Sequence, residues 1–268
     1  MTSHAFRFGT VGGFAATGEA WTGLARRAEE LGYSTLLIPD TLNTLSPFTA
    51  AAAATAVTSR LRVGTYVAAA PYRTPAVVAR EVSTLQALSG GRFELGIGAG
   101  RPGAEQEAAA LGVRFGTPSE RVERVVETLD AVKDVPVLIA AAGTRLLRLA
   151  AERADTVALG LPATATEDDL AAKLDELYEL AGDRFNRLEI NTNLAAVGDE
   201  LPGWLSQQLG ADPREIVARG GYGIMTGSTD QIADTLRSRR DRLGISYISI
   251  SAQFMEQFAP VVERLTGT

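Results

Sequence analysis

The sequence has no cysteine and only one histidine, and these two absences exclude several kinds of chemistry. Without cysteine, the chain has no thiolate nucleophile, no disulfide and no cysteine-ligated metal. The single histidine, His4, lies close to the amino terminus, where chain ends are commonly frayed. A serine–histidine–aspartate triad and a histidine-rich zinc site are therefore not expected.

Clusters of positive charge and long apolar runs are also missing. The formal net charge is −6, and no basic stripe offers the cations that a nucleic-acid surface needs. No apolar run approaches the roughly 20 residues of a membrane-spanning helix, and the first residues lack the pattern of a signal peptide. We therefore predict a cytoplasmic protein that binds neither nucleic acid nor membranes.

The composition is that of an ordinary globular protein, with 46% hydrophobic and 22% charged residues. A chain of 268 residues can form two average domains or one α/β barrel. No linker rich in Pro, Gly or Ser divides it. We therefore predict a single domain over residues 1–268.

Strand-like and helix-like segments alternate along the whole chain. The predicted strands span residues 6–11, 34–38, 61–69, 92–97, 136–140, 155–159, 188–197 and 245–250. Helical patterns separate them, including an alanine-rich helix from Pro47 to about Ser59 and two short helices between residues 198 and 222. Eight such units predict a (β/α)8 barrel, whose ligands bind at the carboxyl ends of the strands.

Residues 88–100 show most clearly how such a site could form. Ser89-Gly90-Gly91 is typical of a helix end, and a strand follows from Arg92 to Ile97. The strand then runs into Gly98, Ala99 and Gly100, which carry little or no side chain. A flat ligand could therefore lie against the main chain at this point.

Residues 98–103 also match the dinucleotide-binding pattern G-x-G-x-x-G. That pattern belongs after the first strand of a Rossmann unit, whereas this match follows a fourth strand and contains Pro102. We therefore do not assign a dinucleotide site. A purely structural role, in which the glycines let the strand end tightly, stays open.

Other candidate ligand-binding residues each have a structural alternative. Gly143-Thr144 and Gly227-Ser228-Thr229 open helices and could offer backbone N–H groups to an anion, but each is equally typical of a capped helix. Asp40, Tyr66 and Arg101 could contact a ligand at the predicted mouth, or serve only packing and surface charge.

Several stretches together resemble the bacterial luciferase-like superfamily, and particularly its branch of deazaflavin (F420)-dependent oxidoreductases. They are residues 28–40, 60–65, 80–85, 88–100, 227–232, 243–248 and 259–262. The resemblance implies a (β/α)8 barrel, in agreement with the periodicity. It also implies an oxidoreductase that holds F420, or alternatively FMN, across the mouth and acts on a small molecule. A homodimer formed through the early helices is expected on the same basis.

The resemblance also implies roles for individual residues. Asp40 would contact the ring, Tyr66-Val67 would match a bulge that often contains a non-proline cis peptide bond, Ala99-Gly100 would back the cofactor, and Gly143-Thr144 would lie near its phosphate. The full set of implied cofactor-binding residues is Asp40, Tyr66, Val67, Ala69, Ala99, Gly100, Arg101, Ala142, Gly143 and Thr144. No residue is assigned as a catalytic acid or base, and no metal is expected.

The sequence departs from the family pattern in three ways. Thr41 stands where alcohol dehydrogenases of this branch have a histidine, and Arg101-Pro102 replaces an acidic residue, which disfavours alcohol oxidation. The connection at residues 132–136 is too short for the usual substrate-covering hairpin, so the pocket is more open or is closed by a partner. The strand ends at residues 68–70 and 140–142 are all alanine and supply only backbone polar groups.

Three hypotheses for function remain. The first is a reductase that uses reduced F420 to transfer a hydride to an electron-poor double bond. The second is an FMN-dependent monooxygenase of the same fold. The third is a barrel without redox activity that acts as a binding or assembly partner. The residues specify neither the substrate nor the direction of hydride transfer.

Overall fold

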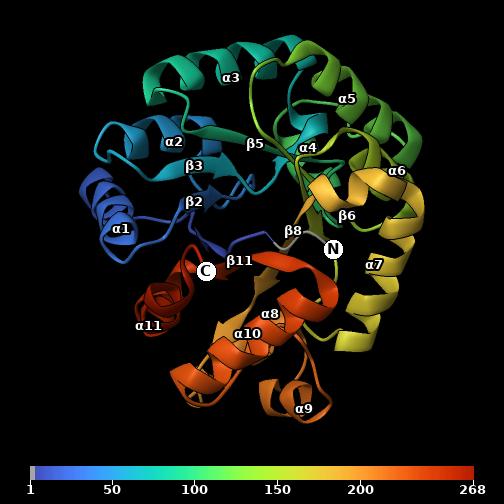
Figure 1. Ribbon diagram of the computed structural model, residues 1–268. Coiled ribbons are helices and arrows are strands. Elements are labelled where there is room, and N and C mark those ends of the chain that lie inside the picture. Colours follow the sequence, from blue (N-terminus) through green and yellow to red (C-terminus); the bar gives the residue numbers. More distant parts are fainter. Residues whose placement is uncertain (1–3) are drawn as a thin grey trace.

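The computed structural model describes residues 4–268, which form a closed barrel of eight parallel strands (Figure 1). In order around the barrel, the strands are β1 (Arg7–Val11), β2 (Thr35–Ile38), β3 (Arg62–Thr65), β5 (Phe93–Gly98), β6 (Val137–Ala141), β7 (Thr156–Leu159), β8 (Glu189–Leu194) and β11 (Ile245–Ser251). Pairing of β1 with β11 and of β3 with β5 closes the cylinder. The predicted (β/α)8 barrel is confirmed.

Helices surround the strands as an outer ring. They are α1 (Gly18–Glu30), α2 (Pro47–Thr55), α3 (Pro75–Ser89), α5 (Pro118–Ala131), α6 (Thr144–Arg153), α7 (Glu167–Ala181), α10 (Thr229–Leu243) and α11 (Met255–Leu265). The connection between α5 and β6 is short, as the sequence predicts. Gly90 ends α3 in the left-handed conformation (φ 64°), which glycine adopts without steric cost.

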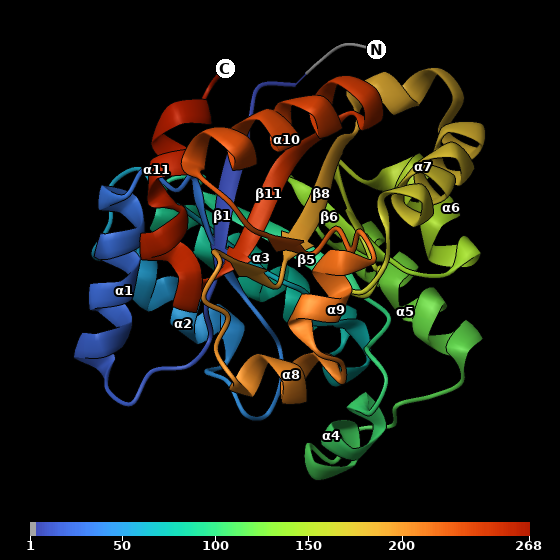
Figure 2. The ribbon, with the colours of Figure 1, turned by 90° about the horizontal axis from the view of Figure 1, so that it is seen from below.

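Shorter elements lie outside this repeat. They are the helices α4 (Ala104–Ala110), α8 (Trp204–Leu209) and α9 (Pro213–Ala218), and the 3-10 turns η1 (Ala70–Tyr72), η2 (Gly182–Arg187) and η3 (Ala252–Phe254). Figure 2 shows α4 and α8 at the end of the barrel opposite the chain's carboxyl terminus. The strands' carboxyl ends face this side, so α4 and α8 border the expected ligand-binding end.

The predicted boundaries are wrong in three places. The alanine-rich helix α2 stops at Thr55 rather than at about Ser59. The backbone N–H groups of Ser59, Arg60 and Leu61 donate to the Glu29 carboxylate instead of to helical carbonyl groups. The segment at residues 188–197 forms two strands, since β9 (Ala196–Val197) leaves the barrel. It pairs with β10 (Ile224–Met225), a strand that the sequence analysis missed.

The third predicted strand is also divided, into β3 and β4 (Ala68–Ala69), by one extra residue relative to its neighbour β5. Gly64 lies opposite Glu94 and Ala68 lies opposite Ile97, so four steps on one strand match three on the other. The peptide bond between Tyr66 and Val67 within this irregularity is cis. The interruption is a bulge, which a run of strand-forming residues does not reveal.

Two layers of side chains form the core. The larger layer lies between the strands and the helices and includes Phe8 and Phe93, which are fully buried. The smaller layer fills the inside of the barrel and consists of Leu37, Leu138, Ala158 and Tyr247, with Val11, Tyr66, Val67 and Ala140 packed against them. This inner layer separates the two ends of the barrel.

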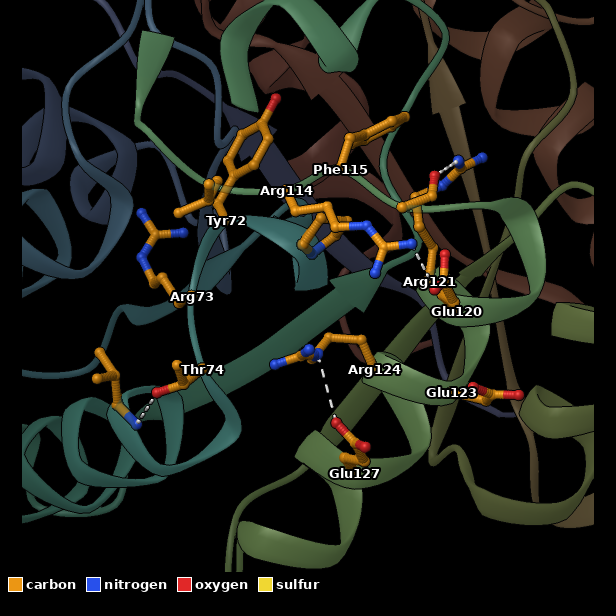
Figure 3. A pocket seen from close by; sticks show the side chains of 14 residues that line it. Tyr72, Arg73, Thr74, Arg114, Phe115, Glu120, Arg121, Glu123, Arg124 and Glu127 are labelled. Atoms are coloured by element: carbon orange, nitrogen blue, oxygen red, sulfur yellow. Dashed lines mark hydrogen bonds and ion pairs between the residues drawn. The ribbon is translucent and has the colours of Figure 1, made fainter. Parts of the chain in front are cut away.

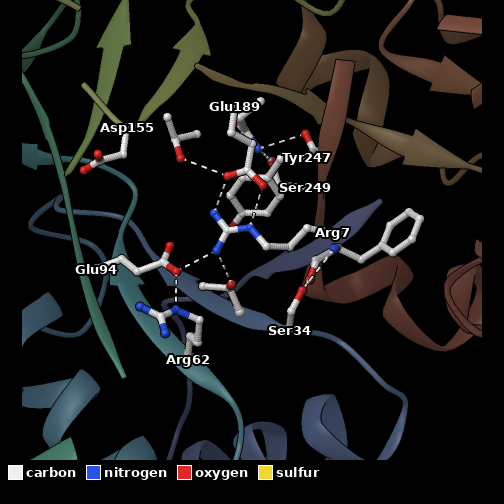
Figure 4. Close-up of polar contacts among 12 residues, drawn as sticks. Arg7, Ser34, Arg62, Glu94, Asp155, Glu189, Tyr247 and Ser249 are labelled. Carbon is white, nitrogen blue, oxygen red and sulfur yellow. Dashed lines mark hydrogen bonds and ion pairs between the residues drawn. The ribbon is translucent and has the colours of Figure 1, made fainter. Parts of the chain in front are cut away.

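The amino-terminal end of the barrel is closed by four charged residues, Arg7, Arg62, Glu94 and Glu189, which we call the base cluster (Figure 4). Arg7 Nη1 lies 2.6 Å from Glu94 Oε1, and Arg7 Nη2 lies 2.7 Å from Glu189 Oε2. Arg62 pairs with the same Glu94 carboxylate, and the Arg7 guanidinium lies 3.8 Å above the Tyr247 ring. Each charge is thus compensated within the cluster.

Candidate active site

A cavity of about 400 Å³, which we call the mouth cavity, lies at the carboxyl ends of five consecutive barrel strands. It is lined by Pro39, Asp40, Thr41, Tyr66, Val67, Ala69, Tyr72, Gly98, Ala99, Gly100, Arg101, Pro102, Ala104, Ala140, Ala142, Leu146 and Gly160. Glycine or alanine ends β5, β6 and β4, the short strand that continues β3, so the space that larger side chains would fill stays open. The volume lies within the range of small-molecule sites.

Most of the residues predicted to hold a cofactor meet in this cavity. Those that line it are Asp40, Tyr66, Val67, Ala69, Ala99, Gly100, Arg101 and Ala142. Gly143 and Thr144 do not line it, and the Thr144 hydroxyl donates to Glu176 Oε1 at 2.8 Å. In the other predicted anion loop, the Gly227 N–H donates to Asp199 Oδ1 at 2.8 Å, so that loop already holds a carboxylate.

Asp40 is committed to contacts within the protein. Its Oδ2 atom accepts hydrogen bonds from the Ala69 N–H at 3.0 Å and from Arg73 Nη1 at 2.5 Å, and its Oδ1 atom accepts from Arg73 Nη2 at 3.1 Å. Only 6% of the Asp40 side chain is exposed. The carboxylate therefore fixes β4 and the turn after it, which form one wall of the cavity. Sequence reasoning missed Arg73, because nothing local marks it as a partner of Asp40.

Arg101, on the opposite side of the cavity, is also paired. It forms a salt bridge with Glu107 of α4, and the same carboxylate accepts a hydrogen bond from the Tyr72 hydroxyl at 2.7 Å. Burial, together with the neighbouring Glu107 carboxylate, raises the pKa of Tyr72 well above its usual value. Tyr72 therefore stays protonated near neutral pH and donates to Glu107.

Tyr66 extends from β3 across the inside of the barrel. Its hydroxyl donates to Asn191 Oδ1 of β8 at 2.7 Å and accepts from the Ser249 hydroxyl of β11 at 3.4 Å. Burial raises the pKa of Tyr66 to about 12. Sequence reasoning missed Asn191 and Ser249, because polar residues inside a strand give no sign of a partner on the opposite wall.

A second cavity of about 530 Å³, the arginine-lined cavity, lies beside the mouth cavity, and Tyr72 lines both (Figure 3). Arg73, Arg114, Arg121 and Arg124 line it. Arg114 pairs with Glu120 at 2.6 Å and Arg124 pairs with Glu127 at 3.3 Å.

Arg121 differs from these ion-paired arginines. It donates to the Gly116 carbonyl oxygen at 2.9 Å and lies 4.3 Å above the Phe115 ring, but pairs with no carboxylate among residues 4–268. Glu120, Glu123 and Glu127 also line this cavity, so its lining is mixed in charge, and Arg121 is the arginine in it that is not engaged by a carboxylate among residues 4–268.

The mouth cavity therefore offers shape and main-chain groups rather than free acids or bases. Within residues 4–268, no group of three or more His, Cys, Asp or Glu side chains is placed to hold a metal ion. Across the same residues, no helix combines the length and apolar character that crossing a membrane requires. Such a site can bind and orient a ligand that brings its own reactivity.

The match to a known family agrees with this geometry. The luciferase-like monooxygenase family matches residues 3–135, which include the first four barrel strands and most of the residues that line the mouth cavity. The predicted resemblance to the luciferase-like superfamily is confirmed. The first half of the chain thus matches the luciferase-like monooxygenase family, and the whole chain forms a (β/α)8 barrel.

Curated relatives match parts of the chain. An uncharacterized protein of Mycobacterium tuberculosis is 31% identical over 128 residues, which cover 39% of this chain and 44% of that protein. The 4-hydroxyprotoasukamycin monooxygenase of Streptomyces nodosus subsp. asukaensis is 34% identical over 116 residues, covering 41% and 29%. The 5,10-methylenetetrahydromethanopterin reductase of Methanolobus tindarius is 27% identical over 157 residues, covering 50% and 47%. Each match spans less than half of the relative's length.

Solved structures match over the whole barrel at low sequence identity. The coenzyme F420-dependent tetrahydromethanopterin reductase of Methanopyrus kandleri has a TM-score of 0.72 at 16% identity, covering 98% of this chain and 99% of that one. A riboflavin lyase with modified FMN has a TM-score of 0.77 at 13% identity, covering 99% and 93%. These likenesses establish a shared fold.

Proposed function

We propose that the protein is an oxidoreductase that binds F420 across the mouth cavity and, with the cofactor reduced, transfers a hydride to a small, uncharged organic substrate. The observation that carries the proposal is the convergence of Asp40, Tyr66, Val67, Ala69, Ala99, Gly100, Arg101 and Ala142 on one cavity. Those residues come from four separate strand ends, and they are the ones that the resemblance to the luciferase-like superfamily predicts for cofactor binding.

The residues of the mouth cavity fit a planar, tricyclic ring. Gly98 and Ala140 present a low wall, Val67 and Leu146 present apolar faces, and the cavity is large enough for a small-molecule ligand. For the anionic tail of such a cofactor, the structure offers two candidate positions, the amino terminus of α6 at Gly143 and the arginine-lined cavity. The second contains Arg121, which pairs with no carboxylate among residues 4–268.

When bound, reduced F420 would supply the hydride, and the protein's residues bind, orient and exclude water. Asp40 is neutralised by Arg73, and Arg101 is neutralised by Glu107. Neither charge is left to compensate a charged substrate, so the apolar lining favours an uncharged one. Tyr66 keeps its proton in the bond to Asn191, so solvent would supply the proton that completes a reduction.

An FMN-dependent monooxygenase is the second candidate. It is supported by the match to the Streptomyces monooxygenase, which is more identical in sequence than the matched reductase, although over a shorter stretch. The two tricyclic rings are similar in size and shape, so the lining of the mouth cavity does not favour one over the other. The two candidates differ in their cofactor and in whether oxygen is consumed.

The test is to titrate the purified protein separately with F420 and FMN, following cofactor fluorescence. Ala140→Leu serves as the variant that fills the cavity, because Ala140 is half-buried and lines it. Ala87→Leu is its matched control, since Ala87 is exposed on α3. Gly100→Val is a poorer choice, because a Cβ atom at Gly100 would lie 2.8 Å from the Phe115 ring and would disturb the fold itself.

Micromolar or tighter binding of F420, weakened by Ala140→Leu and unchanged by Ala87→Leu, would support the reductase. Preference for FMN together with oxygen consumption would favour the monooxygenase. Binding of neither cofactor would remove both proposals and leave a non-redox barrel, for which a stable complex with another protein would be sought.

A further inference from the structure

Tyr66 joins opposite walls of the barrel. In the circular order of the eight strands, β3 and β8 are four positions apart, so they face each other across the barrel. The bond from the Tyr66 hydroxyl to Asn191 therefore spans the interior from one wall to the other (2.7 Å). The tyrosine ring lies between these walls, in the layer that separates the two ends of the barrel.

The position of the ring places it under the mouth cavity. Below it lie Leu37, Leu138, Ala158 and Tyr247, with which it packs. Tyr66 also lines the mouth cavity and remains half-buried rather than fully covered, so part of the ring faces the open space above. No other aromatic side chain that lines this cavity comes from inside the barrel, since Tyr72 belongs to η1.

The groups that hold the hydroxyl are themselves fixed. Asn191 is fully buried and its Nδ2 group donates to the Tyr247 carbonyl oxygen at 3.2 Å, which leaves its Oδ1 atom directed at Tyr66. Ser249 is fully buried, and its hydroxyl lies 3.4 Å from the Tyr66 hydroxyl and 3.1 Å from Asn193 Oδ1, with one proton to donate to either acceptor. A tyrosine held only by packing would not need partners on two different strands.

We propose that Asn191 and Ser249 are positioning residues which, through the Tyr66 hydroxyl, hold the tyrosine ring as the floor of the mouth cavity. This floor limits how deeply a ligand can enter the barrel. It therefore favours an uncharged planar ring that lies flat across the mouth and disfavours a ring that enters the barrel end-on. This inference rests on the proposed function only for the identity of the natural ligand. The floor itself follows from the contacts of the three residues.

The first experiment removes the floor and replaces it with a small molecule. Tyr66→Ala should create a site for phenol in which the phenol hydroxyl meets Asn191, and phenol should bind this variant but not the wild type, as measured by calorimetry. Phenol should bind Tyr66→Ala more tightly than benzene does. The double variant Tyr66→Ala/Asn191→Leu should lose that preference, because the acceptor is gone.

The second experiment follows the ligand above the floor. Lumichrome, an uncharged three-ring compound without a phosphate tail, serves as the probe and its fluorescence as the readout. Tyr66→Ala should weaken lumichrome binding by about tenfold or more, and phenol should restore it over the same phenol concentrations at which phenol itself binds. Phenol should not restore binding to Ala140→Leu, whose defect lies in the wall rather than the floor.

Circular dichroism establishes that each variant is folded. A folded Tyr66→Ala that binds no phenol, or lumichrome affinity that is equal in wild type and Tyr66→Ala, would overturn the proposal, as would a wild type that does not bind lumichrome. If Tyr66→Ala does not fold, Tyr66→Phe and Asn191→Leu replace it, and lumichrome affinity unchanged in both would overturn it. Lumichrome binding with phenol rescue but no binding of F420 or FMN would contradict only the proposed function.

Discussion

The two ends of the barrel are built from the same strands in opposite ways. At the base, the strands begin with long charged side chains, and Arg7, Arg62, Glu94 and Glu189 fill the cross-section and neutralise one another. At the mouth, several of the same strands end in glycine and alanine, and a cavity of about 400 Å³ remains. One end is thus closed by side chains and the other is left open by their absence.

The two ends of the barrel also differ in where their charged side chains find partners. Base charges pair with each other across the interior, whereas the mouth charges Asp40 and Arg101 pair outward, with Arg73 beyond η1 and Glu107 on α4. The base should therefore determine stability, and the mouth should determine binding. In a (β/α)8 barrel this division is expected, because ligands bind at the carboxyl ends of the strands.

The largest effect on stability is expected from the base. Glu94→Gln removes the carboxylate that both Arg7 and Arg62 contact, and leaves two partly buried guanidinium groups without it. We expect the free energy of unfolding to fall by about 3 kcal/mol, as measured by urea denaturation. Glu127→Gln, which breaks the exposed pair with Arg124, is the control and should cost less than about 1 kcal/mol. Equal losses of stability in the two variants would show that the base cluster contributes no more to stability than an exposed ion pair.

Asp40→Asn should have the next largest effect on stability. Asp40 lies at the mouth, but its charge is paired with Arg73 outside the barrel interior. The variant keeps an acceptor for the Ala69 N–H but loses the bidentate ion pair with Arg73. We expect a loss of about 2 kcal/mol in the free energy of unfolding, together with weaker ligand binding, since β4 forms one wall of the cavity. A loss of stability without any change in ligand affinity would contradict the assignment of Asp40 to the wall.

Ala140→Leu should give the reverse pattern, with little effect on stability and a clear effect on binding. Ala140 packs against the inner layer on one side and lines the mouth cavity on the other, so the added side chain extends into the cavity and the free energy of unfolding should change by less than about 1 kcal/mol. Ligand affinity should fall by about tenfold or more, equivalent to about 1.4 kcal/mol. Thermal denaturation and fluorescence titration on the same preparation measure both quantities. Strong destabilisation of Ala140→Leu with unchanged ligand affinity would contradict the expectation that the mouth determines binding and the base determines stability.

The smallest expected effect is pH-dependent and lies at the edge of the base. Burial alone would raise the pKa of Glu29, but three backbone N–H donors from Ser59, Arg60 and Leu61 outweigh it and hold the pKa below its ordinary value. Glu29 therefore stabilises the fold at pH values above its unfolded-state pKa. This contribution disappears as the pH falls through the folded-state pKa.

Glu29→Gln should accordingly be less stable than the wild type at pH 7, and the difference should shrink towards pH 3. Urea denaturation across this range measures it. A difference that stays constant with pH would mean that the carboxylate charge contributes nothing, and that only the shape of the side chain matters.

The barrel could be predicted from the sequence because its signals are local. Alternating strands and helices, proline at helix starts and glycine at helix ends each need only a few neighbouring residues, as in Thr74-Pro75 and Gly90 of α3. Most of the mouth residues were also predictable, because the end of a strand fixes which end of the barrel its next residues reach. The contacts of those residues were not.

Arg73, Asn191 and Ser249 illustrate what local signals omit. Arg73 is 33 positions from Asp40, and Asn191 and Ser249 are 125 and 183 positions from Tyr66. Whether such side chains meet depends on the register and closure of the whole sheet. The assignments of individual residues to a cofactor, and the expected homodimer, stay predictions.

The extra residue in the third strand has an evolutionary consequence. In a regular strand, neighbouring side chains point to opposite faces, yet Tyr66 and Val67 both line the mouth cavity, while Ala68 returns to the outer core and Ala69 to the cavity. The Thr65 hydroxyl maintains the contact with β5 across the irregularity, through the backbone of Gly96. An inserted codon is the smallest genetic change that adds one residue to a strand. Here the extra residue gives the inner wall two adjacent side chains, while β4 still pairs with β5 and Ala68 packs in the outer core.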